Sequence, residues 1–151
     1  MGKKKVIQQT KEQVIKESES IESNVAKKVG TSGKGNHFEN GKIFIQATYN
    51  NTLITVTDTH GNTITWMSAG SLGFSGPKKS TPFAASKVAE AIAQKIEKTG
   101  PNNVEIFVCG VGSGRDSAVR SFIAKGLNVL SIKDVTPVPH NGPKPPKVRR
   151  I

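Results

Sequence analysis

The last fifteen residues of the chain, 137–151, combine positive charge with proline. They hold five prolines and no acid, and their permanent cations are Lys144, Lys147, Arg149 and Arg150. Because proline fixes φ and lacks a backbone donor, this segment cannot join a helix interior or a central strand. We expect an extended, polyproline-like tail that presents its cations outward. A charge run is most often only a solvated surface, but the lack of carboxylates here favours a phosphate-binding arm.

A second candidate site is the glycine-rich stretch Gly110-Val-Gly-Ser-Gly-Arg115, which lies between an apolar run and a helical pattern. Glycines let a phosphate approach the backbone, and a helix N-terminus offers N–H groups and partial positive charge. Gly112, Ser113, Gly114 and Arg115 would then contact an anion, Arg115 through its guanidinium fork. Close packing alone also explains such glycines, and the pattern leaves both interpretations open. Arg115 stands where a dinucleotide fingerprint needs glycine, so that motif fails.

Two smaller polar groups are further candidates for anion contacts. Lys78, Lys79, Ser80 and Thr81 precede a helical pattern, and two cations and two hydroxyls at a helix start suit an anion. Ordinary helix capping explains the two hydroxyls, but it does not explain the pair of lysines. Asn50-Asn51 is a polar turn between two strands and a candidate contact for phosphate or sugar, although most such tips are only turns.

Catalytic and metal-binding chemistry find little support in the sequence. The acids of the central region show no convergence, and its first strand holds none, which argues against metal-dependent hydrolysis. His37, His60 and His140 lie in linker, turn and tail without ligand spacing. Cys109 is the only cysteine and lies in an apolar run, so we expect a buried small hydrophobe and no disulfide. We therefore expect no catalytic residue, no metal site and no cofactor.

The charge of the chain favours a polyanionic partner. Its 151 residues include 22 basic and 11 acidic side chains, a formal net charge of +11. Residues 42–136 account for only +4 of this, so the excess lies in the ends of the chain, which suits nucleic acid better than a small acidic substrate. With six Phe, one Tyr and one Trp, a platform that stacks single-stranded bases is poorly supported. No apolar run is long enough to span a membrane, and we expect no membrane association.

Residues 42–136 show the periodicities of an α/β domain. Alternating residues predict three short strands joined by tight turns into an antiparallel meander, and two helical patterns then alternate with two apolar strands. The predicted elements are strands at 43–48, 53–58 and 63–69, a helix from Pro82 to Gly100, a strand at 104–110, a helix at 115–125 and a strand at 128–135. Right-handed crossovers are expected to place the helices on both faces of one mixed five-stranded sheet, in the order βββαβαβ.

Two extensions are predicted to flank this domain. Residues 1–41 are rich in Lys, Glu, Gln and Ser. They contain a weak apolar stripe with helical spacing, which is followed by several glycines. We expect this N-terminal extension to be mostly disordered, or helical when bound. Residues 137–151 form the extended, basic, proline-rich tail described above.

Four stretches of the chain carry a family resemblance. They are Ala47-Thr-Tyr-Asn-Asn-Thr52, Lys79-Ser-Thr-Pro-Phe-Ala-Ala85, Gly110-x-Gly-x-Gly-Arg115 and the run from Asp134 to Lys147. Together they resemble the universal small-subunit ribosomal protein eleven family over residues 41–151, with an ending similar to the bacterial or plastid type. Val111 and Ser113 replace prolines usual in the glycine loop, so a less rigid loop is expected here.

This resemblance implies a ribonuclease-H-like α/β fold without that fold's catalytic carboxylates. It also implies a structural role in translation, on the platform of the small ribosomal subunit near the messenger exit and the decoded messenger–tRNA region. The implied partners are small-subunit ribosomal RNA and neighbouring platform proteins, with messenger RNA nearby and no homo-oligomer. The implied location is the ribosome of the cytoplasm, or of the plastid stroma for an organellar protein. His140, Asn141 and Gly142 join the RNA contacts named above.

The alternative is a ribonuclease-H-like nuclease, or a nucleotide-binding module that uses the Gly110–Arg115 loop. Such a protein would show Mg²⁺-dependent cleavage or nucleotide affinity in the isolated domain. The lack of acids on the first strand argues against cleavage, so a non-enzymatic RNA-binding protein is the preferred interpretation.

Overall fold

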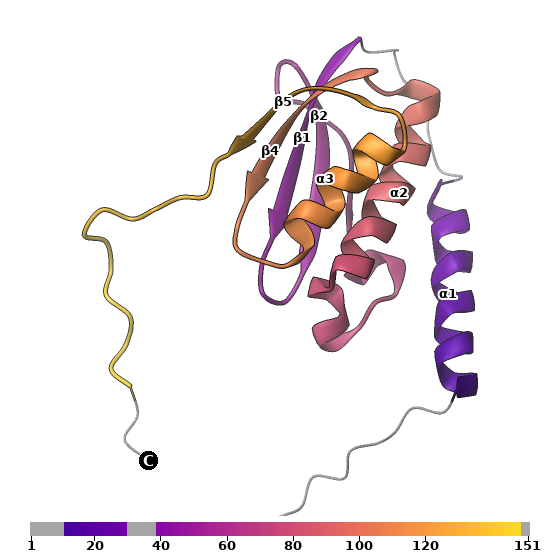
Figure 1. The fold of residues 1–151 in the computed structure, drawn as a ribbon, viewed down its shortest axis with the longest axis horizontal. Helices are drawn as coiled ribbons and strands as arrows, with labels where there is room; N and C mark the ends of the chain where they lie inside the picture. The colour runs from indigo at the N-terminus through magenta and orange to yellow at the C-terminus, as the bar shows by residue number, and fades with distance from the viewer. Residues whose placement is uncertain (1–10, 30–38, 149–151) are drawn as a thin grey trace, which may run out of the picture.

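The computed structural model describes residues 11–29 and 39–148, and these form a five-stranded sheet beside three α-helices (Figure 1). The strands are β1 Asn40–Ala47, β2 Thr52–Asp58, β3 Thr63–Ser68, β4 Asn103–Cys109 and β5 Asn128–Asp134. The helices are α1 Lys11–Val29, α2 Pro82–Thr99 and α3 Gly114–Ala124, with the short 3-10 helices η1 Gly70–Leu72 and η2 Gly76–Ser80 before α2. The predicted order βββαβαβ is confirmed from β1 to β5.

The sheet is mixed, with strand order β3-β2-β1-β4-β5. β1 pairs antiparallel with β2 and β2 pairs antiparallel with β3, which confirms the predicted meander. β1 and β4 pair in parallel, as do β4 and β5. As a result β1, β3, β4 and β5 all run in the same direction, and their carboxyl ends meet at one end of the sheet.

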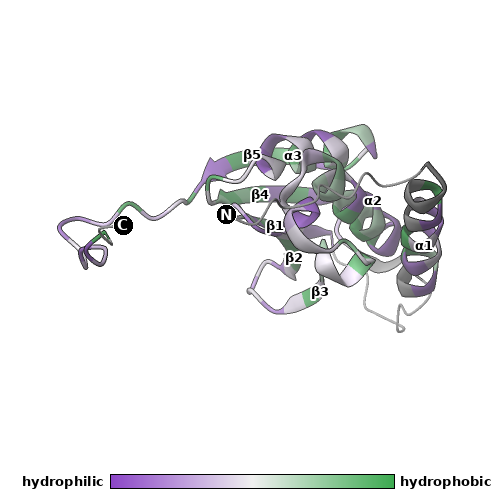
Figure 2. Cartoon of the chain, turned by 90° about the horizontal axis from the view of Figure 1, so that it is seen from below, coloured by the Kyte–Doolittle hydropathy of each residue, from purple (hydrophilic) through white to green (hydrophobic). Residues whose placement is uncertain are grey.

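The helices α2 and α3 lie side by side on one face of the sheet, so the prediction of helices on both faces is wrong (Figures 1 and 2). The reason lies in the strand order. Both crossovers, β3 to β4 through α2 and β4 to β5 through α3, move across the sheet in the same direction. Two right-handed crossovers that move the same way must place their helices on the same face.

Burial along the strands follows this one-sided arrangement. In β1, Ile43, Ile45 and Ala47 are buried toward the helices, whereas Phe44 and Gln46 are exposed on the opposite face. In β4, buried residues alternate with half-buried ones, although most of the strand is apolar. The core therefore lies between the helices and one face of the sheet, and the other face is open.

Residues 11–29, which fall in the extension predicted to be mostly disordered, form α1. Ile21 and Val25, two members of the weak apolar stripe, are partly buried against the core. The stripe is weak because it is interrupted by polar residues, and contact with α2 and η1 compensates for this. Residues 1–10 and 30–38 lie outside the described part of the chain. None of the described helices is long and apolar enough to cross a bilayer.

Local signals fix the two helices on the sheet. Thr81 is the N-cap of α2, since its Oγ1 accepts a hydrogen bond of 3.2 Å from the Ala84 N–H, and Pro82 takes the first position. In α3, Ala118 and Phe122 are fully buried. The next residue, Ile123, points away from the core, and 53% of its surface is exposed.

The first testable prediction concerns these two neighbours on α3. Replacing Phe122 by Ala removes a fully buried ring and should lower the free energy of unfolding by about 3–5 kcal/mol. Replacing Ile123 by Ala should change it by less than about 0.5 kcal/mol, because that side chain is exposed. Urea denaturation of the three proteins measures both values, and comparable losses in the two variants would contradict the described face of α3.

Candidate nucleic-acid interface

The structure brings the segments predicted to bind an anion to one end of the sheet. Each follows the carboxyl end of one of the four mutually parallel strands (Figure 1). The segments are Asn50-Asn51 after β1, Lys78–Thr81 after β3, the glycine loop 110–114 after β4, and the tail after β5. Segments that are far apart in sequence therefore share one end surface.

The glycine loop is the centre of this end surface, because hydrogen bonds join it to the other three segments. The N–H of Gly112 donates to the Ala47 carbonyl at the end of β1 (2.9 Å). The hydroxyl of Ser113 donates to the Ser80 carbonyl before α2 (3.0 Å). The N–H of Gly110 donates to the Thr136 hydroxyl at the start of the tail (3.1 Å). Ser113, which replaces a usual proline, thus supplies one of the three tethers.

Close packing explains why the loop requires its glycines. Gly110 has a φ of +99°, and a Cβ there would overlap the Ala47 carbonyl oxygen. A Cβ at Gly112 would overlap the Thr48 carbonyl oxygen, and one at Gly114 would lie 2.7 Å from the Thr52 hydroxyl. Gly112 and Gly114 are also buried. The glycines therefore give no independent support for a phosphate site, and backbone contact with phosphate stays a prediction.

Arg115 holds the glycine loop to the end of β5. Its Nη1 donates to the Gly110 carbonyl (2.6 Å) and its Nη2 to the Asp134 carboxylate (2.5 Å). Asp134 also accepts hydrogen bonds from the N–H (2.9 Å) and the hydroxyl (2.6 Å) of Thr136. We call Gly110, Arg115, Asp134 and Thr136 the clamp, since these four residues fix the point at which the tail leaves the domain.

Electrostatics favour the charged form of both ionisable members of the clamp. Hydrogen bonds from Thr136 and then from Arg115 hold the pKa of Asp134 far below its usual range. The bond to Asp134 raises the pKa of Arg115. The guanidinium predicted to grip a phosphate is thus already engaged within the protein. The partnership of Arg115 with Asp134 was not predicted, since 19 residues separate the two in sequence.

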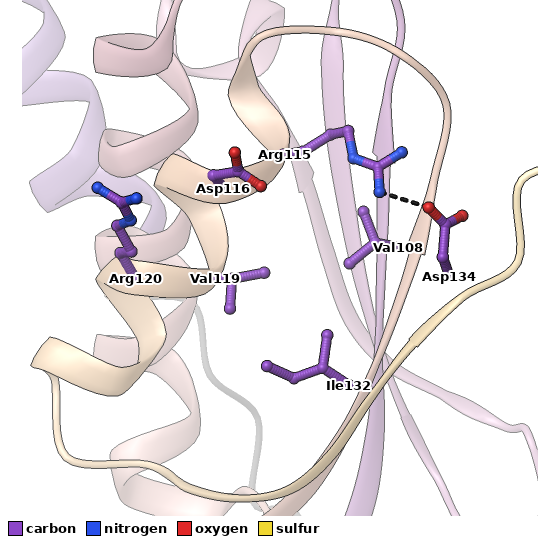
Figure 3. A pocket seen from close by; sticks show the side chains of 7 residues that line it. All are labelled: Val108, Arg115, Asp116, Val119, Arg120, Ile132 and Asp134. Carbon is purple, nitrogen blue, oxygen red and sulfur yellow. Dashed lines mark hydrogen bonds and ion pairs between the residues drawn. The ribbon is translucent and has the colours of Figure 1, made fainter.

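A hollow beside the clamp lies between α3 and β5 (Figure 3). Val108, Val119 and Ile132 form its apolar floor, and the Arg115–Asp134 pair borders it at the end near the glycine loop. A nucleotide site at a glycine loop needs accessible backbone N–H groups for its phosphates. Gly112 and Gly114 are buried and Arg115 is paired with Asp134, so the hollow gives the nucleotide-binding alternative no support.

The segment before α2 uses its hydroxyls for its own structure. Thr81 caps the helix and also donates to the Lys78 carbonyl (2.8 Å). The Ser80 hydroxyl donates to the Pro77 carbonyl (3.1 Å). The anion-binding part of the prediction therefore rests on Lys78 and Lys79, whose side chains are half-buried at the end surface.

The turn after β1 is held together by Thr48. Its Oγ1 accepts hydrogen bonds from the N–H groups of Asn51 (3.1 Å) and Asn50 (3.4 Å). The predicted tight turn is confirmed, with Asn50 exposed and Asn51 half-buried. Turn formation does not use the Asn50 side chain, which remains a candidate for a polar contact.

The tail runs away from the domain, and every residue from 137 to 148 is exposed (Figure 2). It contains neither helix nor strand in this described range. Asn141 has a φ of +52° and precedes Gly142, so the chain bends there and is not one straight rod. Lys144 and Lys147 lie after the bend, and the residues next to them are prolines or uncharged. Arg149 and Arg150 lie outside the described residues.

The described acids do not form a metal-binding or hydrolytic centre. Within residues 11–29 and 39–148, no three His, Cys, Asp or Glu side chains gather closely enough to hold an ion. The buried Asp58 lies at the opposite end of the sheet, where its carboxylate accepts two hydrogen bonds of 2.9 Å from Asn62. The side-chain bond from Asn62 is the main cause of the lowered pKa of Asp58.

An α/β domain that places a lysine pair and a basic tail at one end has the charge distribution typical of nucleic-acid-binding proteins. Comparison with known proteins agrees with this class. The model of the family described as ribosomal protein S11 matches residues 41–150. The small ribosomal subunit proteins uS11 of two strains of Treponema pallidum, one of them the Nichols strain, are each 57% identical to the chain over 118 residues, which cover 78% of this chain and 93% of theirs.

The chain belongs to the ribosomal protein S11 family. It is accordingly a structural protein of the small ribosomal subunit that serves translation in the cytoplasm, and it is not an enzyme. RNA binding is typical of this family. The matched region begins at residue 41, so α1 lies outside it.

The second prediction tests the close packing of the glycine loop with a matched pair of glycines. Gly126 also has a positive φ (+82°), but a Cβ there would meet nothing within 4 Å. Gly126→Ala should therefore cost only the backbone strain, about 1–2 kcal/mol of unfolding free energy. Gly110→Ala should cost a further ~1–3 kcal/mol because of the overlap with Ala47. Equal losses in urea denaturation would show that the loop does not press against β1.

The third prediction concerns the pH dependence of the clamp. The pKa of Asp134 is lower in the folded chain than in the unfolded chain, where it is about 4. Its contribution to stability should therefore be fully present above about pH 4 and should fade as the pH falls further. Asp134→Asn should lower the urea midpoint at pH 7, and the difference from the parent should shrink toward pH 2.5. A difference that stays constant over this range would contradict the clamp.

Proposed function

We propose that this protein binds small-subunit ribosomal RNA through the end surface and the tail. The cations that face the RNA are Lys78, Lys79, Lys144, Lys147, Arg149 and Arg150. Asn50, Asn51 and the tail residues His140, Asn141 and Gly142 supply polar contacts, and the backbone of Gly112–Gly114 lies close to a phosphate. Ser80, Thr81 and Ser113, whose hydroxyls are engaged within the protein, position the lysines and the glycine loop. Phosphate contacts of this kind fix position and orientation on an RNA without reading its sequence.

One observation carries this proposal: four polar segments leave the sheet at the same end, and two of them, the segment before α2 and the tail, are basic. A folded RNA offers phosphates over a broad surface, and converging cations can neutralise several of them together. Arg115 takes a different role from the one predicted. It orients the tail through the clamp and acts as a positioning residue.

The resemblance of the sequence extends the proposal to a location. The protein would sit on the platform of the small subunit, near the messenger exit and the decoded messenger–tRNA region. Its neighbours would be other platform proteins, with messenger RNA close by. The tail, which reaches away from the domain, suits a position where RNA surrounds the protein on more than one side (Figure 1).

No observation favours the nuclease or nucleotide-binding alternative. Cleavage of the ribonuclease H type needs carboxylates that converge on metal ions. The described residues contain no such group, and the arginine of the glycine loop is engaged by Asp134.

The fourth prediction is that the tail provides a large part of the RNA affinity. Each neutralised phosphate contributes a slope of roughly −0.7 to −0.9 to log K against log salt. Removing residues 137–151 eliminates four cations and should flatten the slope by about 3. The domain should stay folded, because residues 137–148 are exposed. Filter binding to small-subunit ribosomal RNA over a range of salt concentrations measures the slope.

A matched pair of full-length variants separates charge from stiffness. Replacing Lys144, Lys147, Arg149 and Arg150 by Gln keeps the prolines and should reproduce the flattened slope. Replacing Pro143, Pro145 and Pro146 by Ser keeps the charges and should weaken binding at every salt concentration without changing the slope, since only the entropy of ordering rises. An unchanged slope in the Gln variant would refute the role of the tail.

A further inference from the structure

In the described residues α2 and α3 lie on one face of the sheet, and the opposite face carries no helix (Figure 2). Several large apolar side chains lie on that open face. Paired residues on neighbouring strands place one row of side chains across all five strands: Trp66, Thr55, Phe44, Phe107 and Lys133. The next row toward the glycine loop contains Ser68, Leu53, Gln46 and Cys109, with Val135 just past the end of β5. We call the apolar members of these rows, which are Trp66, Phe44, Phe107, Leu53, Cys109 and Val135, the sheet patch.

The sheet patch is unusually exposed for a set of large apolar side chains. The exposed fraction is 59% for Trp66, 47% for Val135 and 39% for Phe44. Soluble monomers rarely leave such side chains contiguous on one face, and a contiguous patch marks an interaction site. The single tryptophan and the single cysteine of the chain both belong to it.

Charged side chains lie at the rim of the sheet patch and are already engaged. The Lys133 ammonium lies 3.7 Å from the Glu105 carboxylate. The Lys42 ammonium donates to the Thr59 carbonyl at 3.0 Å. An uncharged aromatic centre with a polar rim is the usual anatomy of a protein–protein interface. A polyanion would instead require several uncommitted cations in the patch.

The geometry of the rings also argues against RNA bases on this face. Phe44 and Phe107 stack on each other, with centroids 5.0 Å apart and 16° between the ring planes. The Lys133 ammonium also lies over the Phe107 ring, 5.4 Å from its centroid. A base needs an open ring face to stack on. The half-buried Phe107 is already in contact with Phe44 and Lys133, which suits the side-chain packing of a protein partner better than a stacked base.

We propose that the sheet patch is the docking surface for a neighbouring protein of the small ribosomal subunit. The partner presents an uncharged, apolar surface, because any charge set against the patch would lose its hydration without gaining a counter-ion. Val135 joins the patch to the start of the tail, so the docked protein lies beside the RNA-bound tail. This proposal assigns a surface to the neighbouring proteins named in the proposed function. It depends on membership of the small subunit and does not depend on the proposed RNA contacts.

Cys109 provides a direct test, because it is half-buried within the patch and no other cysteine is present. Its alkylation by N-ethylmaleimide is followed by mass spectrometry in the free protein, in its complex with naked ribosomal RNA, and in intact small subunits. We expect alkylation at least tenfold slower in intact subunits than in the RNA complex. Equal rates in these two samples would overturn the proposal, as would full protection by RNA alone or by a dimer of the free protein.

Substitutions in the patch give a second, independent readout. Trp66→Lys and Phe44→Lys place a charge in the patch, and Ile123→Lys places the same charge on the outer side of α3, where 53% of the side chain is exposed. All three variants should bind naked ribosomal RNA within twofold of the parent. Small subunits assembled with the two patch variants should lack a neighbouring protein that is present with Ile123→Lys, as counted by quantitative mass spectrometry.

The outcomes of this experiment separate the two proposals. A full protein complement with Trp66→Lys, the variant least able to disturb the fold because of its exposure, would overturn the docking surface. Unchanged RNA binding and salt slope in the tail variants of the fourth prediction would overturn only the proposed function. Urea denaturation of each variant confirms that the comparison is made between folded proteins.

Discussion

The approach of the glycine loop to the end of β1 is the constraint on which the rest of the structure depends. Gly110, Gly112 and Gly114 lie so close to Ala47, Thr48 and Thr52 that a Cβ at any of the three would overlap these residues. This contact sets the start of α3, and through Ser113 and Thr136 it also fixes the segment before α2 and the residue that precedes the tail. Glycine is therefore needed here for packing, and the packing in turn aligns the groups proposed to face RNA.

The direction of the strands distributes functions over the molecule. Because four strands are parallel, their carboxyl ends form a single end surface, and polar loops collect there without cost to the core. Because both crossovers move the same way, the helices cover one face and leave the other open. The end surface is basic and hydrogen-bonded, whereas the open face is apolar and aromatic. The same topology thus produces two surfaces that suit two different kinds of partner.

The sequence predicted the elements well because their signals are local. Alternation in β1 to β3, the Thr81 cap with Pro82, and the stop at Gly100 each act within a few residues. The face occupied by the helices could not be read this way, since it depends on the order of strands in the sheet. Arg115 and Asp134 were both noticed, but their pairing requires β4 and β5 to be neighbours. The helix α1 was underestimated because its stripe is weak and its support comes from tertiary contact. The relation to ribonuclease H rests on the resemblance alone and stays a prediction.

Ultraviolet cross-linking of intact small subunits, followed by mass spectrometry of the peptides joined to RNA, tests the central claim most directly. The claim is that RNA lies against the end surface and the tail and not against the open sheet face. The account predicts cross-linked peptides from residues 48–51, 76–81 and 137–151, with none from the exposed side of β1 to β4. Cross-links concentrated at Phe44, Trp66 and Phe107, with the tail unmodified, would contradict it.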